Sequence, residues 1–148
     1  GLNREDLKSI GFGALLHDIG EMSIPDSILH KPDELNEEER HIISWHPAHG
    51  YDLLSPIQYL QNALDIPRYH HERWDGSGYP EGLKGEEIPL AARIFAVVDV
   101  MDALTSPRPY REAWPGEKVI AYIRENAGVL FDPVVVRYFL SIIDKKTE

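Results

Sequence analysis

The sequence predicts an all-α fold, a bundle of helices with one long glycine-rich loop. Three observations favour this class. Residues that cap helix N-termini, Asn3, Asn36 and Asp132, each precede a segment with helical apolar spacing. The segment 90–104 is apolar on nearly all sides, which is typical of a buried central helix. Glycines and prolines gather between residues 75 and 89, where they predict a loop.

The N-terminal segment is predicted to form a helix that starts after Asn3 and runs toward His17. Apolar residues recur on roughly one face of it: Leu7, Ile10, Ala14 and Leu15. Gly20 is well placed to end this helix, because glycine is the usual residue just beyond a helix C-terminus. A short turn or helix is predicted at residues 25–29.

A second long helix is predicted from residue 37 up to Pro56. Its N-cap is Asn36, and three glutamates follow, whose charges favour the positive end of the helix dipole. His46 and His49 would lie one turn apart on it. Two further helical segments are predicted at residues 57–64 and 67–74.

The C-terminal half is predicted to be helical after the loop. Segment 90–104 contains β-branched residues that could form a strand around 94–98, but its length and alanine-rich start favour a helix. Two more helices are predicted at residues 117–126 and 133–143. Asp132 is the N-cap of the last one, and Pro133 occupies its first position.

The composition excludes several classes of protein and site. The 148 residues are 43% hydrophobic and 27% charged, which fits one globular domain. A formal net charge of −10 disfavours nucleic-acid polymers, because phosphate neutralisation needs clustered Lys and Arg. With no cysteine, a metal site must use imidazole and carboxylate. No apolar run reaches the roughly 20 residues of a membrane span, so we expect a cytoplasmic domain without membrane contact.

Potential metal ligands fall in four separate places along the chain. They are His17-Asp18, His46 near His49, the pair His70-His71, and Asp99 with Asp102. Adjacent helical residues point about 100° apart and can serve different ions, while a carboxylate can bridge two cations. Two ions about 3.5–4 Å apart can activate water and clamp phosphoryl oxygens. The pattern therefore indicates a two-metal site for phosphoester hydrolysis, with Asp18, Asp99 and Asp102 as candidate catalytic carboxylates.

Structural explanations compete at some of these positions. His49 fits a packing residue better than a ligand, and Asp102 could bond to nearby backbone at the helix end. Asp99 lies in a strongly apolar segment, where an unpaired carboxylate is costly to bury. It therefore needs a cation or hydrogen-bond donors, and Arg93 is the structural alternative to a metal.

Motifs along most of the chain together resemble those of a known family. The most specific is HHERWDGSGYP at residues 70–80; the others are LHDIG at 16–20, IPDSIL at 24–29, HP at 46–47, DVMDALT at 99–105, RPYR at 108–111 and FDP at 131–133. In order and spacing they resemble the HD-GYP family, the cyclic di-GMP phosphodiesterases among the HD metallohydrolases. The resemblance runs from Ala14 to about Leu140.

The resemblance implies an HD-domain-like helical bundle over residues 1–148 with two or three divalent metal ions, iron or manganese. The implied ligands are His17, Asp18, His46, His70, His71 and Asp99, with Asp18 bridging. Tyr79 of the glycine loop, Arg108 and Arg111 are the implied substrate contacts. Arginine suits this role, because its planar guanidinium donates paired hydrogen bonds to phosphate oxygens. The product would be linear pGpG, GMP or both.

Glu21 is a departure from the family pattern. The family has a lysine directly after His-Asp-x-Gly, and that lysine is thought to contact the substrate phosphate. A glutamate there removes an attraction to the substrate phosphate and adds a repulsion. Each of these two energies is of order 4 kcal/mol at about 4 Å and an effective dielectric near 20, before screening by salt. Three alternatives remain: Glu21 turns to solvent, pairs with Lys31 or an arginine, or adds an oxygen ligand to a metal ion.

A second departure concerns the N-terminus. Family members carry an additional helix upstream of His-Asp, which bears a further ligand histidine. This chain begins only 16 residues before His17, and no such histidine is present. We expect fewer ligands to weaken one metal site, and the chain as it stands to be poor in metal, self-associated or inactive.

The sequence is compatible with three competing functions. The first is a phosphodiesterase that hydrolyses cyclic di-GMP in bacterial second-messenger signalling, alongside signalling-domain partners. The second is a degenerate domain that binds the nucleotide or a partner protein without turnover, as Glu21 would favour. A third is a metal-dependent phosphohydrolase for another cyclic dinucleotide or nucleotide.

Overall fold

A computed structural model describes residues 3–107 and 111–145 of the chain. These residues form helices and turns, with no strand and one isolated β-bridge between Ala127 and Phe131. The predicted all-α class is confirmed. The α-helices are α1 (Arg4–Leu16), α2 (Asp26–Leu29), α3 (Glu37–Ile43), α4 (His46–Leu54), α5 (Asp65–Tyr69), α6 (Leu90–Thr105), α7 (Gly116–Glu125) and α8 (Pro133–Asp144). Short 3-10 helices are η1 (Ile19–Ser23), η2 (Gln58–Ala63) and η3 (Gly85–Glu87).

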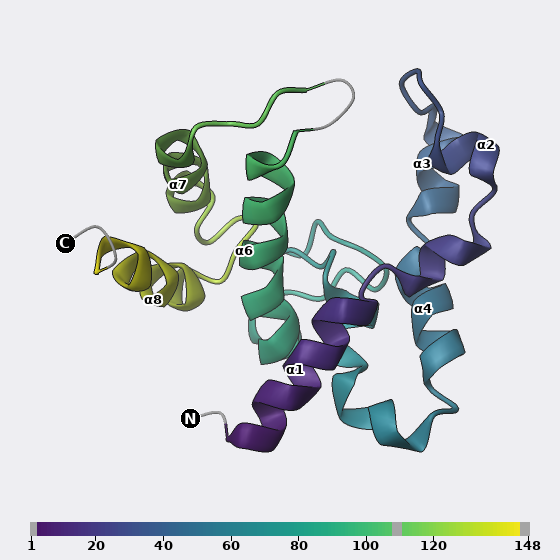
Figure 1. Ribbon diagram of the computed structural model, residues 1–148, viewed down its shortest axis with the longest axis horizontal. Coiled ribbons are helices and arrows are strands. Elements are labelled where there is room, and N and C mark those ends of the chain that lie inside the picture. Colours follow the sequence, from purple (N-terminus) through teal and green to yellow (C-terminus); the bar gives the residue numbers. More distant parts are fainter. Residues whose placement is uncertain (1–2, 108–110, 146–148) are drawn as a thin grey trace.

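Helix α6 is the centre of the bundle. In Figure 1 it stands between α7 and α8 on the left and α4 on the right, and α1 runs across its lower end. It packs against α5, α7 and α8, while α1 packs against η2 and α5, and α4 packs against η1 and α5. The N-terminal helices therefore converge on α5, which in turn rests on α6.

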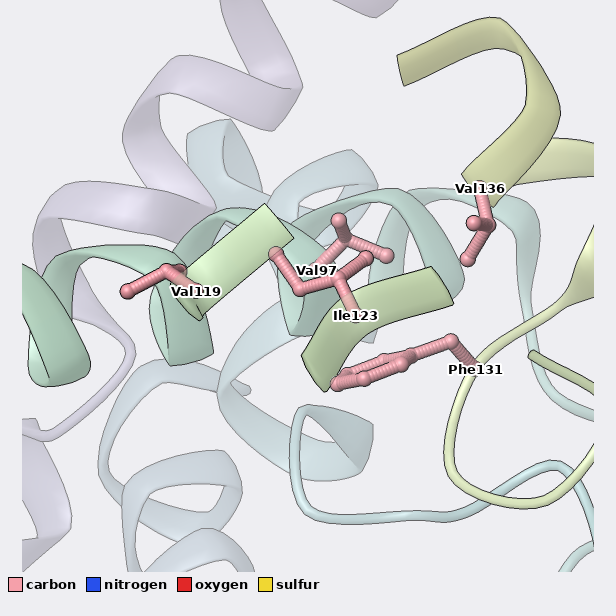
Figure 2. Close-up of a cluster of buried hydrophobic side chains, with 5 residues drawn as sticks. All are labelled: Val97, Val119, Ile123, Phe131 and Val136. Carbon is pink, nitrogen blue, oxygen red and sulfur yellow. The ribbon is translucent and has the colours of Figure 1, made fainter. Parts of the chain in front are cut away.

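The main apolar core lies between α6, α7 and α8. It consists of Val97, Val119, Ile123, Phe131 and Val136, all of them buried (Figure 2). Burying an aliphatic or aromatic side chain of this kind contributes roughly 1.5–3 kcal/mol. This core holds α7 and α8 against the side of α6 that lies opposite α4 in Figure 1.

The predicted N-caps are confirmed. The Asn3 side chain accepts hydrogen bonds from the backbone of Glu5 and Asp6, and Asn36 accepts one from Glu39. Asp6 and Glu39 in turn accept from the cap backbone, which completes two capping boxes. The Asp132 side chain accepts from Val134 at 2.7 Å. These caps satisfy the backbone N–H groups that the first turn of a helix leaves unpaired.

The predicted helix 37–55 is instead two helices, α3 and α4, separated at Ser44 and Trp45. Pro47 explains the break: it has no N–H to donate to the Ile43 carbonyl, and its ring would clash with that carbonyl in a continuous helix. His46 thereby becomes the first residue of α4 rather than a residue in the middle of a long helix.

The helix predicted at residues 67–74 is also wrong in its bounds. Helix α5 starts at Asp65 and ends at Tyr69, so that His70 and His71 follow it in a turn. The carbonyl oxygen of His71 accepts from the backbone N–H of Tyr79 at 3.2 Å. Because the glycine loop folds back and takes this acceptor, the helix does not continue.

Two predicted apolar surfaces are more exposed than expected. On α1, Leu7 and Leu15 are 58% and 81% exposed, and the helix packs instead through Gly13, where an added Cβ would lie 2.7 Å from the Ala63 carbonyl oxygen. Helix α6 is central but not buried on all sides, because Leu90 and Val98 are 43% and 42% exposed. Neither α6 nor any other described helix is long and apolar enough to span a membrane.

Candidate metal centre

A close approach of two backbones brings the His17-Asp18 pair to helix α4. His17 follows the last residue of α1, and Gly20 in η1 is buried against α4. A Cβ at Gly20 would lie 1.9 Å from the His46 carbonyl oxygen and 2.5 Å from the Gly50 nitrogen. Only glycine allows the two segments this near to each other, which places Asp18 beside His46.

Three histidines are oriented by their own backbone. In each, the ring atom Nδ1 lies 2.8–2.9 Å from a carbonyl oxygen three or four residues earlier in the chain. They are His17 on Ala14, His46 on Ile43 and His70 on Ile66. Since a carbonyl oxygen only accepts, Nδ1 carries the proton, and Nε2 of the neutral ring presents a lone pair. Metal-binding histidines are commonly oriented in this way.

The three Nε2 atoms converge on the carboxylate of Asp18. Its Oδ1 lies 3.3 Å from His46 Nε2 and 3.4 Å from His70 Nε2. Its Oδ2 lies 2.9 Å from His17 Nε2. The two oxygens of Asp18 thus face different imidazoles, which is the arrangement that a bridging carboxylate needs.

Four residues can each offer one ligand atom within 4.8 Å of the others: Asp18, His46, His70 and His71, here called the four-residue cluster. In it, His46 Nε2 and His70 Nε2 are 3.2 Å apart. With both Nδ1 atoms protonated, two lone pairs face each other, and a cation between them removes the repulsion. Imidazole nitrogen with carboxylate oxygen suits first-row divalent metals. The residues therefore fit a divalent metal ion.

Electrostatics keep Asp18 and His71 in ligating forms, whereas the Asp18 carboxylate favours the protonated ring of His17, whose Nε2 proton a metal ion must displace. The hydrogen bond with Asp18 raises the pKa of His17 to about 9. Burial acts to raise the pKa of Asp18, but the close rings of His17, His46 and His70 hold it well below the usual range. Burial, together with the neighbouring His70 and His46, lowers the pKa of His71 to about 2. Asp18 is thus ionised and His71 neutral near pH 7, which are the forms that bind metal.

Helix α6 borders the cluster with Phe95 and Asp99. The ring centroid of buried Phe95 lies 4.9 Å from that of His17 and 6.2 Å from that of His70. One turn further, Asp99 Oδ1 lies 3.8 Å from His17 Nε2. The carboxylate predicted to need a cationic partner therefore points toward His17, whereas the alternative partner, Arg93, binds Asp132 at 2.7 Å.

Tyr79 of the glycine loop covers His71. The two rings stack with centroids 4.8 Å apart and planes 28° apart. Burial raises the pKa of the Tyr79 phenol to about 12, so the hydroxyl keeps its proton and can donate. The predicted substrate contact is thus adjacent to the four-residue cluster.

Glu21 lines a cavity of about 380 Å³ together with His17, Asp18, Met22 and Asp26. Burial and the nearby charge of Asp18 raise the pKa of its carboxyl group. Lys31, one of its alternative partners, instead binds Glu39 at 2.7 Å. Among the described residues, no Lys or Arg lines this cavity or forms an ion pair with Glu21.

Three further candidates lie apart from the cluster or outside the described residues. Asp102 is exposed, and among the described residues no hydrogen bond or ion pair joins its side chain to the cluster. The guanidinium of Arg111 donates to the Ala103 carbonyl and lies 5.7 Å from the Trp114 ring centroid. Arg108 falls outside the described residues.

Glu72 was part of the HHERWDGSGYP motif, but the sequence assigned it no role. The residue is 4% exposed, and its carboxylate accepts three backbone N–H groups from the glycine loop. The available signal was an acidic residue directly after two histidines and directly before a glycine-rich segment. A buried carboxylate in that place needs donors, and a loop that folds back supplies them.

A family model for the HD domain matches residues 1–135, which contain the whole four-residue cluster. This chain belongs to the HD-GYP branch of the HD domain family. The resemblance that the motifs carried is confirmed. As an HD-GYP domain, it has a histidine and aspartate cluster that fits divalent metal.

The HD-GYP domain is 52% identical over 135 residues to a cyclic di-GMP phosphodiesterase response regulator from Xanthomonas campestris pv. campestris. The aligned residues make up 90% of this chain and 36% of that protein. It is 40% identical over 147 residues to 3'3'-cGAMP-specific phosphodiesterase 2 of Vibrio cholerae, over 98% and 28% of the two chains. A solved structure of an HDG"Y"P protein from Bdellovibrio bacteriovorus has the same fold, with a TM-score of 0.74 at 20% identity, over 97% and 45% of the chains. The chain spans less than half the length of each.

Proposed function

We propose that this domain is a metal-dependent phosphodiesterase that hydrolyses cyclic di-GMP to pGpG, GMP or both. The observation that carries the proposal is the convergence of three imidazole Nε2 atoms on the Asp18 carboxylate, next to Asp99. Paired cations are the usual solution for in-line displacement at phosphorus. The relatives named as cyclic di-GMP phosphodiesterases support the choice of substrate.

The proposed ligands are His17, Asp18, His46, His70, His71 and Asp99. They would hold two ions, iron or manganese, with a third ion as the alternative stoichiometry. Bound ions supply positive charge to the phosphoryl oxygens and lower the pKa of water. The chain itself keeps Asp18 ionised, orients three Nε2 atoms through backbone acceptors, and covers the centre with Phe95 and Tyr79.

Substrate binding is proposed to use Tyr79 and the arginines after α6. The protonated phenol of Tyr79 can donate a hydrogen bond to a phosphate oxygen. Arg111 would have to leave the Ala103 carbonyl to reach a nucleotide, and Arg108 belongs to the same segment. Because Asp18, Glu21 and Asp26 make the adjoining cavity acidic, bound cations must supply the positive charge for the phosphates there.

The relatives also favour a second substrate, 3'3'-cGAMP. This nucleotide differs from cyclic di-GMP in one base and has the same two phosphodiester bonds, so the metal chemistry is common to both. The non-catalytic alternative is not favoured, because the six proposed ligands lie together despite the unusual Glu21.

The test is turnover by the metal-loaded protein. Domain loaded with Mn²⁺, or with Fe²⁺ without oxygen, is incubated with each cyclic dinucleotide, and the products are separated by ion-exchange chromatography. Asp18→Asn keeps the side-chain volume but removes one ligand oxygen, and we expect a loss beyond the roughly 10–100-fold typical of changes around a metal ligand. Asp33→Asn, at an exposed position, is the control. Metal-loaded wild type that cleaves neither nucleotide refutes the proposal.

A further inference from the structure

The carboxylate of Glu72 is a buried charge that is held entirely by backbone. Its Oε1 accepts from the N–H groups of Glu81 at 2.7 Å and Gly82 at 3.1 Å, and its Oε2 accepts from Leu83 at 3.0 Å. Among the described residues, no Lys, Arg or His forms an ion pair with it. Burying a charge without a counter-ion is costly, and three charge-assisted hydrogen bonds offset that cost.

These three bonds connect the residue three positions before the glycine loop to the middle of the loop. Glu72 directly follows His71 of the four-residue cluster, whereas Glu81, Gly82 and Leu83 follow the Gly-Tyr-Pro motif. The Glu72 side chain therefore links the segment directly after the cluster to residues 81–83, where the loop folds back towards the cluster. Tyr79 lies in the segment that this connection closes.

The segment closed by these bonds packs against the backbone of His71 and the two residues after it. A Cβ at Gly78 would lie 2.5 Å from the His71 carbonyl oxygen and 2.6 Å from the Glu72 Cα. The backbone N–H of the next residue, Tyr79, donates a hydrogen bond to the same carbonyl oxygen, and its ring stacks on the His71 ring. The loop thus packs directly on the backbone of residues 71–73, and this contact determines where the Tyr79 ring lies.

A second anchor of the loop is weaker. Arg68 binds the Glu81 carboxylate at 2.6 and 2.9 Å, but the side chains are 29% and 38% exposed. Solvent-exposed ion pairs contribute little, because water and salt screen them. The buried carboxylate of Glu72 is the stronger of the two constraints on residues 81–83.

We propose that Glu72 is a positioning residue that holds residues 81–83 so that Tyr79 stays stacked on His71 and forms a fixed wall of the nucleotide site. The effect of this wall on substrate rests on the proposed phosphodiesterase function. Its effect on the loop does not. Glu72 acts through Tyr79 and is not itself a metal ligand or a substrate contact.

The charge and length of Glu72 can be tested separately. Glu72→Gln keeps the volume but has one acceptor oxygen, and its NH₂ group would face the N–H of Leu83, donor against donor. Glu72→Asp keeps the charge but withdraws the carboxylate by one methylene group. The matched control is Glu87→Gln, an exposed glutamate of the same loop that accepts the Lys84 N–H at 2.9 Å.

Two measurements are made on each variant. Amide hydrogen exchange, read by mass spectrometry on peptides that cover 79–83, should accelerate by about tenfold or more in Glu72→Gln, as expected for losing charge-assisted hydrogen bonds. Steady-state kinetics with cyclic di-GMP should give a KM about tenfold higher, with kcat and metal content unchanged, because a uniform binding contact is lost. Glu72→Asp should show smaller changes in the same direction, and Glu87→Gln none.

The outcomes separate this proposal from the proposed function. Faster exchange throughout the molecule, or unchanged exchange in 79–83, overturns the positioning role. A fall in kcat or metal content with KM unchanged also overturns it. If Glu72→Gln does not fold, the Glu72→Asp variant decides on the same criteria. If wild type hydrolyses no cyclic dinucleotide, the proposed function fails, while the exchange data still decide whether Glu72 positions the loop.

Discussion

The contact between η1 and α4 at Gly20 makes a sharp prediction about the metal centre. In Gly20→Ala, the new Cβ would lie 1.9 Å from the His46 carbonyl oxygen, whereas ordinary contact begins at 3.4 Å. The two backbones must therefore separate by about 1.5 Å, the difference between these distances. Asp18, two residues before Gly20, and His46 itself move apart by a similar amount.

The size of the effect follows from that displacement. Overpacking of this kind costs about 1–3 kcal/mol of stability. At the proposed site, a displacement of about 1 Å can reduce the rate by 10²-fold, so we expect at least that loss in kcat/KM. Bound metal should also fall, since the His46 Nε2 to Asp18 Oδ1 distance of 3.3 Å would no longer suit shared coordination.

The assay compares Gly20→Ala with Gly11→Ala. Nothing lies within 4 Å of a Cβ at Gly11 in α1, so alanine should stabilise that helix by about 0.5–1 kcal/mol. Each variant is measured by thermal unfolding, elemental analysis of metal per chain, and hydrolysis of cyclic di-GMP. If Gly20→Ala retains wild-type metal content and melting temperature, the close approach at this glycine does not position the centre, and the reasoning is refuted.

Three further predictions follow from the charges of the molecule. Glu21→Lys should raise kcat/KM at low ionic strength, with a gain that shrinks as salt screens the charge; no gain at any salt concentration would exclude charge repulsion as a defect. Asp132→Ala should destabilise by roughly 3 kcal/mol in urea unfolding, because it leaves the partly buried Arg93 without its carboxylate partner and uncaps α8, whereas exposed Asp144→Ala should not; equal unfolding midpoints for the two variants would contradict this. Removing metal with a chelator should lower Tm by about 5–10 °C if the metal was present at 100 times its Kd, reversibly with Mn²⁺; an unchanged Tm would show that the cluster holds no ion.

The local structure followed closely from the sequence where single residues control it. Asn3, Asn36 and Asp132 cap helices as predicted, because a cap depends on a side chain and the two or three residues after it. The breaks at Pro47 and after Tyr69 were missed. The first was readable from proline chemistry, but the second depends on Tyr79, ten residues later, returning to take the His71 carbonyl.

The candidate site was predicted unevenly for a related reason. Motifs identified all members of the four-residue cluster and Asp99, since these residue types have few other uses in an apolar environment. Asp102 shares the helix of Asp99 but lies exposed one turn away, and Arg111 is engaged with the end of α6. Helical spacing gives the face of a side chain only approximately, and it says nothing about partners from other segments.

The sequence by itself determined the helical class, the main helix starts, the ligand types and the family. Tertiary structure alone decided that Asp18 stands between three imidazoles, that Glu21 shares a cavity with Asp18 and His17, and that Glu72 holds the glycine loop. The physical reason is the distance along the chain over which each kind of interaction acts. Caps and periodicity act within one or two turns, whereas convergence requires backbones from distant parts of the chain to touch, as they do at Gly20 and Gly78.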